Sequence, residues 1–152
     1  MENYAKTILS CYDTIDGYIT QIENVIKIKA KNSFYLRNGT VTLAEQLISL
    51  GEIRKDLIEL SEIVDKMLKK MTEEDKILIS YKYFGVKPKD ENFDLTSRNY
   101  FRKQIRALKR FSELLVKNNY DEEWFKNKYL KIAYISSIYQ LTLNENGKKH
   151  IR

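Results

Sequence analysis

Four arginines recur at every fourth position in one short stretch of this chain: Arg98, Arg102, Arg106 and Arg110. Side chains four residues apart are neighbours on the surface of an α-helix, so a helical stretch would bring these guanidinium groups onto one side. A guanidinium group keeps its positive charge, and its planar donors match phosphate oxygens and guanine edges. The chemistry that this spacing offers is the binding of an anion.

The positive charge of the chain is concentrated around these arginines. The net charge is +6, yet residues 1–71 hold ten basic and ten acidic side chains and are neutral. Residues 97–118 hold seven basic side chains against Glu113 alone. A solvated lysine-rich face explains scattered lysines, but it does not explain four arginines within 13 residues. The pattern indicates a neutral scaffold joined to one anion-binding element.

Residues 97–118 separate into two faces on a helical wheel. The basic side carries Arg98, Arg102, Lys103, Arg106, Lys109, Arg110 and Lys117. The candidate DNA-binding residues are Ser97, Arg98, Asn99, Arg102, Lys103, Arg106, Lys109 and Arg110. The opposite side, which we expect to be buried, carries Phe101, Ile105, Leu108, Phe111 and Leu115. In a helix-turn-helix the N-terminal part of the second helix touches base edges. We therefore expect Arg98, Asn99, Arg102 and Lys103 to contact bases, and Lys109 and Arg110 to contact phosphates.

The residue types that catalysis and metal binding usually require are scarce. Cys11 and His150 are the only residues of their kinds, and the chain has no Gly-rich phosphate loop and no paired metal-ligand spacing. Neighbouring carboxylates such as Glu73 and Glu74 stand at predicted helix starts, where they complement the helix dipole. We therefore expect no enzyme activity, no metal and no other cofactor.

The chain shows no signal for a membrane or an oxidising compartment. No apolar run approaches the length of about 18 residues that a membrane span requires, and the N-terminus lacks the apolar core of a secretory signal. A single cysteine cannot form an internal disulfide, and Cys11 lies in an apolar helical seam where we expect a buried, inert thiol. These observations predict a cytoplasmic protein.

Two long amphipathic helices are predicted in the N-terminal half. They cover residues 4–26 and 43–71, and both place apolar side chains at alternating spacings of three and four, which is typical of coiled-coil packing. Between them, residues 30–42 break the pattern and contain the turn signal Asn38-Gly39. Helices joined in this way form an antiparallel hairpin.

Three shorter helices are predicted in the C-terminal half. Thr72 caps the first, which ends near Gly85, and Thr96 or Ser97 caps the second. The third follows Asp121 as a single helix to residue 140, and residues 141–152 form a frayed tail.

These elements predict an all-α fold with two parts. A long N-terminal antiparallel helical hairpin occupies residues 1–71, and a helix-turn-helix-like C-terminal helical unit occupies residues 72–152. The stretch 85–96 contains the only proline and no helical period, and is predicted to be a loop.

The segments MTEEDKILISYKYFG and SRNYFRKQIRALKRFSELL resemble a recurring bacterial pattern. They are similar to the region of sigma factors that reads the upstream promoter element, and more so to phage late-gene activators of the ArpU/RinA type. In those activators a helical, often coiled-coil part precedes the helix-turn-helix. By position, the residues that match the pattern are Tyr83, Phe84, Gly85, Ser97, Arg98, Tyr100, Arg102, Arg106, Ala107 and Leu108.

One segment departs from the family pattern. The family normally has a short amphipathic helix between the two motifs, whereas this chain has KPKDENFDLT, with Pro88 and no apolar repeat. Either the supporting helix is reduced to a loop, or the DNA-binding geometry is lost and the fold binds something else.

The resemblance implies a DNA-binding regulator of transcription, encoded by a phage or other mobile element. The helix 97–118 would enter the major groove of double-stranded DNA, and the hairpin would serve dimerisation or contact with RNA polymerase. The alternative function is a phage-encoded inhibitor or adaptor that sets the same basic face on a host protein, and RNA binding is a third.

Overall fold

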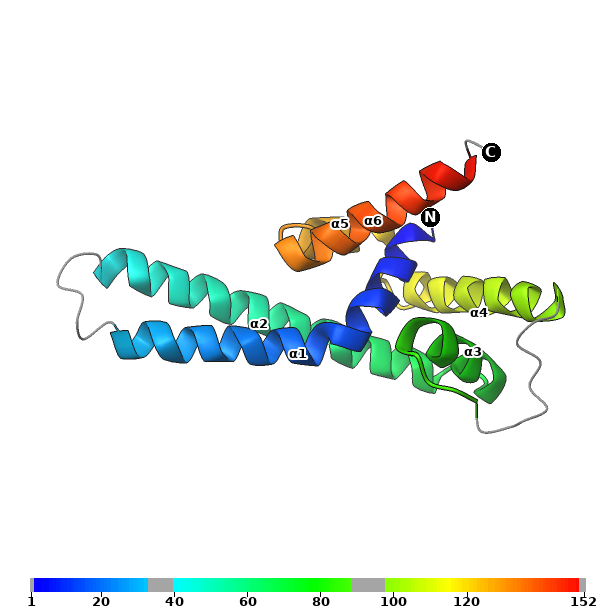
Figure 1. Cartoon of the computed structure of the whole chain (residues 1–152), viewed down its shortest axis with the longest axis horizontal. Coiled ribbons are helices and arrows are strands. Elements are labelled where there is room, and N and C mark those ends of the chain that lie inside the picture. Colours follow the sequence, from blue (N-terminus) through cyan, green and yellow to red (C-terminus); the bar gives the residue numbers. More distant parts are fainter. Residues whose placement is uncertain (1, 33–39, 89–97, 151–152) are drawn as a thin grey trace.

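The computed structural model describes residues 2–32, 40–88 and 98–150. All regular secondary structure in these ranges is helical, which confirms the predicted all-α class. The helices are α1 (Asn3–Asn32), α2 (Thr40–Lys69), α3 (Glu73–Phe84), α4 (Arg98–Lys117), α5 (Glu122–Tyr129) and α6 (Ala133–His150). α1 and α2 form a long antiparallel pair, and the shorter helices gather around its base (Figure 1).

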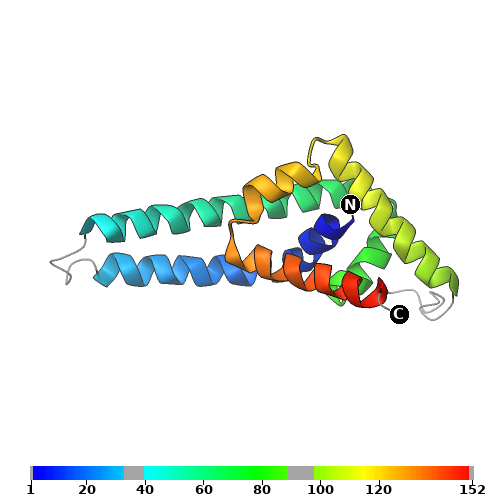
Figure 2. The ribbon, with the colours of Figure 1, turned by 90° about the horizontal axis from the view of Figure 1, so that it is seen from above.

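The hairpin of α1 and α2 projects from one end of the molecule in both views (Figures 1 and 2). Its base is covered, since Leu57, Leu60 and Val64 of α2 are buried. Toward the tip, large apolar side chains are exposed, among them Ile28 of α1 and Ile48 of α2. The two helices bury one face of each against the other, and no third described helix covers the tip.

The first turns of α1 lie at the centre of the molecule. Thr7, Ile8 and Leu9 are consecutive and fully buried, which a helix achieves only when neighbours surround it. The N-terminal part of α1 lies between α4 and α6 in Figure 2, and α3 packs on the same helix. Polar groups here are satisfied: the Thr7 hydroxyl donates to the carbonyl one turn earlier at 2.8 Å. The Tyr4 hydroxyl donates to the Tyr120 carbonyl at 3.1 Å.

Local signals set the ends of the short helices as predicted. Thr72 caps α3, because its Oγ1 accepts from the backbone N–H of Asp75 at 3.2 Å. Asp121 caps α5 by accepting from the backbone N–H of Trp124 at 2.9 Å. Gly85 ends α3 with a φ of 68°, a left-handed conformation that glycine adopts without steric cost.

The C-terminal segment differs from the prediction in two ways. The expected single helix is two helices, because the chain turns at residues 130–132 between α5 and α6. A straight helix of 20 residues would extend about 30 Å, whereas the turn folds α6 back along α1 and buries both Phe125 and Ile135. The predicted fraying is also wrong, since α6 continues to His150 and buries Thr142.

Several predictions concern residues outside the described ranges. These are the turn at Asn38-Gly39, the cap at Thr96 or Ser97, and the loop beyond residue 88. Residues 85–88 are described and are not helical, as predicted for the start of that loop.

The lone cysteine is buried as predicted. Cys11 lies in the covered part of α1, and burial raises the pKa of its thiol to about 12. The thiol therefore stays protonated at physiological pH, and a protonated thiol is a poor nucleophile. Among the helices that the structure describes, none combines the length and the apolar character needed to cross a membrane.

Replacing Ile8 with alanine is expected to lower the free energy of unfolding by about 2–5 kcal/mol, because it removes buried apolar surface and leaves a cavity. Ile28 is the matched control: it lies on the same helix but is 59 % exposed, so Ile28→Ala should cost less than about 0.5 kcal/mol. Urea denaturation followed by circular dichroism measures both. Equal losses would contradict the central position of the first turns of α1.

Tyr83 of α3 gives a pH-dependent prediction. Its hydroxyl is buried without a hydrogen-bond partner among the described residues. Burial, assisted by the charges of Glu2 and Glu145, raises the pKa of the phenol from 10.0 to about 12. Above pH 10 the unfolded chain loses this proton while the folded chain keeps it, so stability falls as the pH rises toward 12.

Tyr83→Phe should make this fall shallower, by up to about 1.4 kcal/mol per pH unit. At neutral pH the variant should be at least as stable as the parent, because the buried hydroxyl has no hydrogen-bond partner among the described residues that phenylalanine would lose. The measurement is urea denaturation on either side of pH 10. If stability falls equally steeply above pH 10 in the parent and the variant, folding does not raise the pKa of Tyr83.

Candidate nucleic-acid interface

α4 lies at the edge of the molecule, at the end opposite the hairpin tip (Figure 1). It packs on α3 and on the first turns of α1. Its buried side chains form one face, made of Tyr100, Gln104, Ala107, Leu108, Phe111 and Leu115. The helix is therefore held by one side and presents the other side to solvent.

Phe101 and Ile105 are exposed, which corrects the predicted apolar face of this helix. Their exposed fractions are 61 % and 63 %. The buried face is rotated toward Gln104, whose side-chain amide donates to the Leu78 carbonyl of α3 at 2.6 Å and to the Tyr100 hydroxyl at 3.1 Å. Because these partners satisfy a buried amide, the polar Gln104 occupies the core and the two apolar side chains face water.

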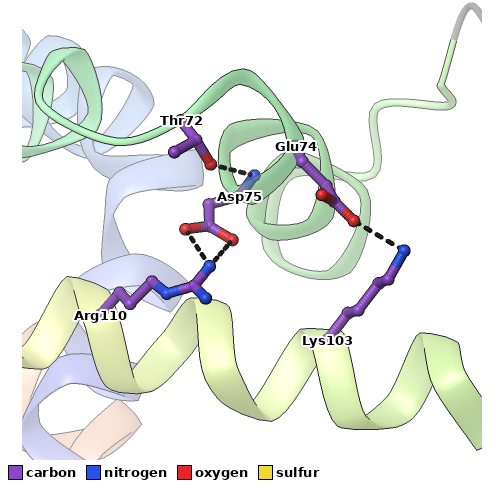
Figure 3. Close-up of polar contacts among 5 residues, drawn as sticks. All are labelled: Thr72, Glu74, Asp75, Lys103 and Arg110. Atoms are coloured by element: carbon purple, nitrogen blue, oxygen red, sulfur yellow. Dashed lines mark hydrogen bonds and ion pairs between the residues drawn. The ribbon is translucent and has the colours of Figure 1, made fainter.

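An ion pair between Asp75 of α3 and Arg110 of α4 joins the two helices (Figure 3). Nη1 of Arg110 donates to both carboxylate oxygens at 2.9 Å. The Asp75 side chain is 4 % exposed and that of Arg110 is 55 % exposed, so an enclosed carboxylate is neutralised from the solvent side. Hydrogen bonding to Asp75, followed by the attraction of its charge, raises the pKa of Arg110.

A second ion pair lies two helical turns toward the start of α4. Nζ of Lys103 is 2.8 Å from Oε1 of Glu74. Both side chains are well exposed, so this pair stabilises the fold only slightly. In Figure 3 Lys103 and Arg110 extend from α4 toward the start of α3. Both cations are therefore engaged within the chain.

The predicted site residues fall into three groups. Ser97 lies outside the described residues, and Lys103 and Arg110 have partners on α3. The others are exposed, and we call them the basic face: Arg98, Asn99, Arg102, Arg106 and Lys109. Within the described ranges, none of the four cations of this face forms a salt bridge.

The basic face is most strongly positive at the N-terminal end of α4. At the other end, Lys109 and Lys117 line a pocket of about 390 Å³ together with Glu2 and Glu113, and the two carboxylates offset the charges of the two lysines. Arg102 lies about two helical turns before Lys109 along α4, and Arg98 lies about three turns before it.

Sequence reasoning missed two residues that shape this interface, Glu74 and Asp75. The signal was present, because both stand in the acidic first turn after Thr72. In the sequence alone, the helix dipole is a sufficient reason for such a turn. The carboxylates of an acidic first turn can also form ion pairs with a basic neighbouring helix. Here Glu74 pairs with Lys103, and Asp75 pairs with Arg110.

No protein-family model, no curated protein and no solved structure matches this chain. What the basic face can do therefore follows from its geometry and its charge. It offers several permanently charged donors on an exposed helix, which suits an extended polyanion. In the part of the chain that the structure describes, no group of three or more His, Cys, Asp or Glu side chains is placed to hold a metal ion.

The Asp75–Arg110 pair predicts a coupled loss of stability. Asp75→Asn keeps the shape of the side chain but removes its charge, so Arg110 loses charge-assisted hydrogen bonds and the urea midpoint should fall. In an Arg110→Gln background, Asp75→Asn should lower the urea midpoint less, because the cationic partner of Asp75 has already been removed.

An Arg102→Gln background is the matched control for this cycle. Arg102 is an exposed arginine of the same helix without a salt bridge to a described residue, so Asp75→Asn should cost as much there as in the parent chain. Equal costs in all three backgrounds would show that the pair does not join α3 to α4.

Proposed function

We propose that this chain is a DNA-binding regulator of transcription and that it sets the N-terminal half of α4 in the major groove. The observation that carries this proposal is the basic face, which is exposed on a helix whose other side is anchored in the core. The major groove admits an α-helix, and arginines that neutralise phosphates release counterions, which is a main source of affinity for duplex DNA.

The position of each side chain along α4 suggests its role. Arg98, Asn99 and Arg102 stand in the first turns, where the second helix of a helix-turn-helix reaches base edges. Arginine pairs with guanine in two hydrogen bonds, and asparagine pairs in the same manner with adenine. Arg106 and Lys109 stand further along and are assigned to phosphates. Lys103 and Arg110 are not assigned to DNA, because they bind α3.

We extend the proposal to a place among phage late-gene activators of the ArpU/RinA type. Its support is the pair of sequence motifs, together with their position on the helices. Phe84, in the first motif, is the last residue of α3, and Arg98, in the second, is the first residue of α4. An origin in a phage or other mobile element is part of the same proposal.

The hairpin tip supplies a second surface, which we assign to a second copy of the chain or to RNA polymerase. Four large apolar side chains are exposed there: Val25, Ile28, Val41 and Ile48. Such a surface is typical of protein contacts when its members are contiguous. Pairing through the tip would give a dimer, whose symmetry appears as two half-sites in the DNA that it selects.

The proposal predicts that the protein enriches a short motif from random double-stranded DNA at about 150 mM salt, an ionic strength near the physiological value. The triple change Arg98→Ala, Arg102→Ala, Arg106→Ala should abolish this binding without unfolding the helix, because all three side chains are exposed. Fluorescence anisotropy of the enriched duplex measures affinity. In the single variant Arg106→Ala, which loses one assigned phosphate contact and keeps measurable affinity, the slope of log affinity against log salt should shrink by about 0.9.

The matched control is Lys27→Ala, Lys31→Ala, Lys66→Ala, which removes the same charge from exposed positions on the hairpin. This control should retain most of the affinity. Equal losses in the two triple variants, or recovery of unselected DNA that dissociates in modest salt, would refute sequence-specific binding by the basic face. The function to examine next would then be the alternative one, contact with a host protein, whose hydrophobic centre makes binding less sensitive to salt.

A further inference from the structure

Two exposed apolar side chains border the basic face. Phe101 and Ile105 are one helical turn apart on α4, and both are more than 60 % exposed. Arg98 and Arg102 occupy the neighbouring strip of the same helix. The exposed side of α4 therefore combines guanidinium groups with a narrow apolar strip that lies between them and the buried face.

The ring of Phe101 has a fixed support. It meets the ring of Tyr100 edge-on, with centroids 5.3 Å apart. Tyr100 is 8 % exposed and contacts Tyr81 of α3 in the same geometry at 6.0 Å. Because Tyr100 is anchored in the core, its contact restricts the orientations that the exposed ring of Phe101 can adopt.

The composition of this strip favours DNA over a protein as its occupant. A phenylalanine side chain buries about 150–250 Å² when it is covered completely, so the exposed parts of Phe101 and Ile105 together supply on the order of 200 Å². A stable protein interface needs about 800 Å² on each partner. The flanking guanidinium groups complement phosphates, and the major groove contains one apolar group, the C5 methyl of thymine.

We propose that Phe101 and Ile105 read thymine methyl groups in the major groove, beside the bases that Arg98 and Arg102 contact. This inference rests on the proposed function. Residues one turn apart are separated by about 6 Å along the helix, and base pairs are stacked about 3.4 Å apart. If α4 lies along the groove, the preferred sites hold two thymines about two base pairs apart.

Replacement of thymine by deoxyuridine tests the inference, because uracil lacks only the C5 methyl group. The probe is the duplex enriched from random double-stranded DNA, remade with deoxyuridine at one thymine position at a time. Affinity should fall about fourfold at two positions, which is the equivalent of one buried methylene, about 0.8 kcal/mol, at each. Phe101→Ala should remove the penalty at one of these positions, and Ile105→Ala should remove it at the other.

Two control variants distinguish the recognition of thymine methyl groups from a general change in DNA affinity. Leu141→Ala removes a side chain of the same size and the same 63 % exposure from α6, outside both proposed binding surfaces, and it should leave both uracil penalties intact. Arg102→Ala should weaken binding to every duplex and also keep both penalties.

The inference and the proposed function fail in different ways. Tight binding of duplexes that tolerate uracil at every position would overturn thymine reading and leave the proposed function standing. Thymine reading would also be overturned if the loss of affinity on uracil substitution remained unchanged in both Phe101→Ala and Ile105→Ala. If the chain enriches no duplex at all, the inference and the proposed function fail together.

Discussion

The fold depends on the burial of the first turns of α1. Residues such as Ile8 and Leu9 point in different directions from the helix axis, and both are fully covered. The hydrophobic effect therefore acts on this helix from several sides at once, and α3, α4 and α6 share it as a common support. Tyr4 adds a directional contact, because its hydroxyl binds the carbonyl of Tyr120 in the chain segment between α4 and α5.

The surface that α4 presents is set by its rotation about its own axis. Successive residues of an α-helix differ by about 100°, so a modest rotation exchanges core and surface positions. Two contacts with α3 fix this rotation: the amide of Gln104 reaches the Leu78 carbonyl, and Arg110 reaches Asp75. They bring Gln104 into the core and leave Phe101 outside. The composition of the candidate interface is therefore decided by partners on α3.

The sequence predicted those features that depend on neighbouring residues. Thr72 and Asp121 cap helices because each side chain reaches a backbone N–H three residues later. Periodicity was sufficient to predict that two long helices exist, but not where they end, since α1 extends to Asn32 and α2 begins at Thr40, within the predicted break at 30–42. The rotation of α4 could not be predicted in this way, because the carbonyl that binds Gln104 lies 26 residues away. The same holds for the turn between α5 and α6, which depends on the surface of α1. Exposed basic side chains were easier to find, since arginines are rarely buried without partners.

The two ion pairs with α3 also make the distribution of positive charge around α4 uneven. Glu74 and Asp75 cancel the charges of Lys103 and Arg110 on one side of α4, while Arg98, Arg102 and Arg106 on the solvent side have no such compensation among the described residues. The hairpin at the opposite end belongs to a neutral half of the sequence. Uncompensated positive charge is thus concentrated on the solvent side of α4. In the field of a polyanion such an off-centre charge experiences a torque, so the molecule would turn this helix toward the polyanion before contact.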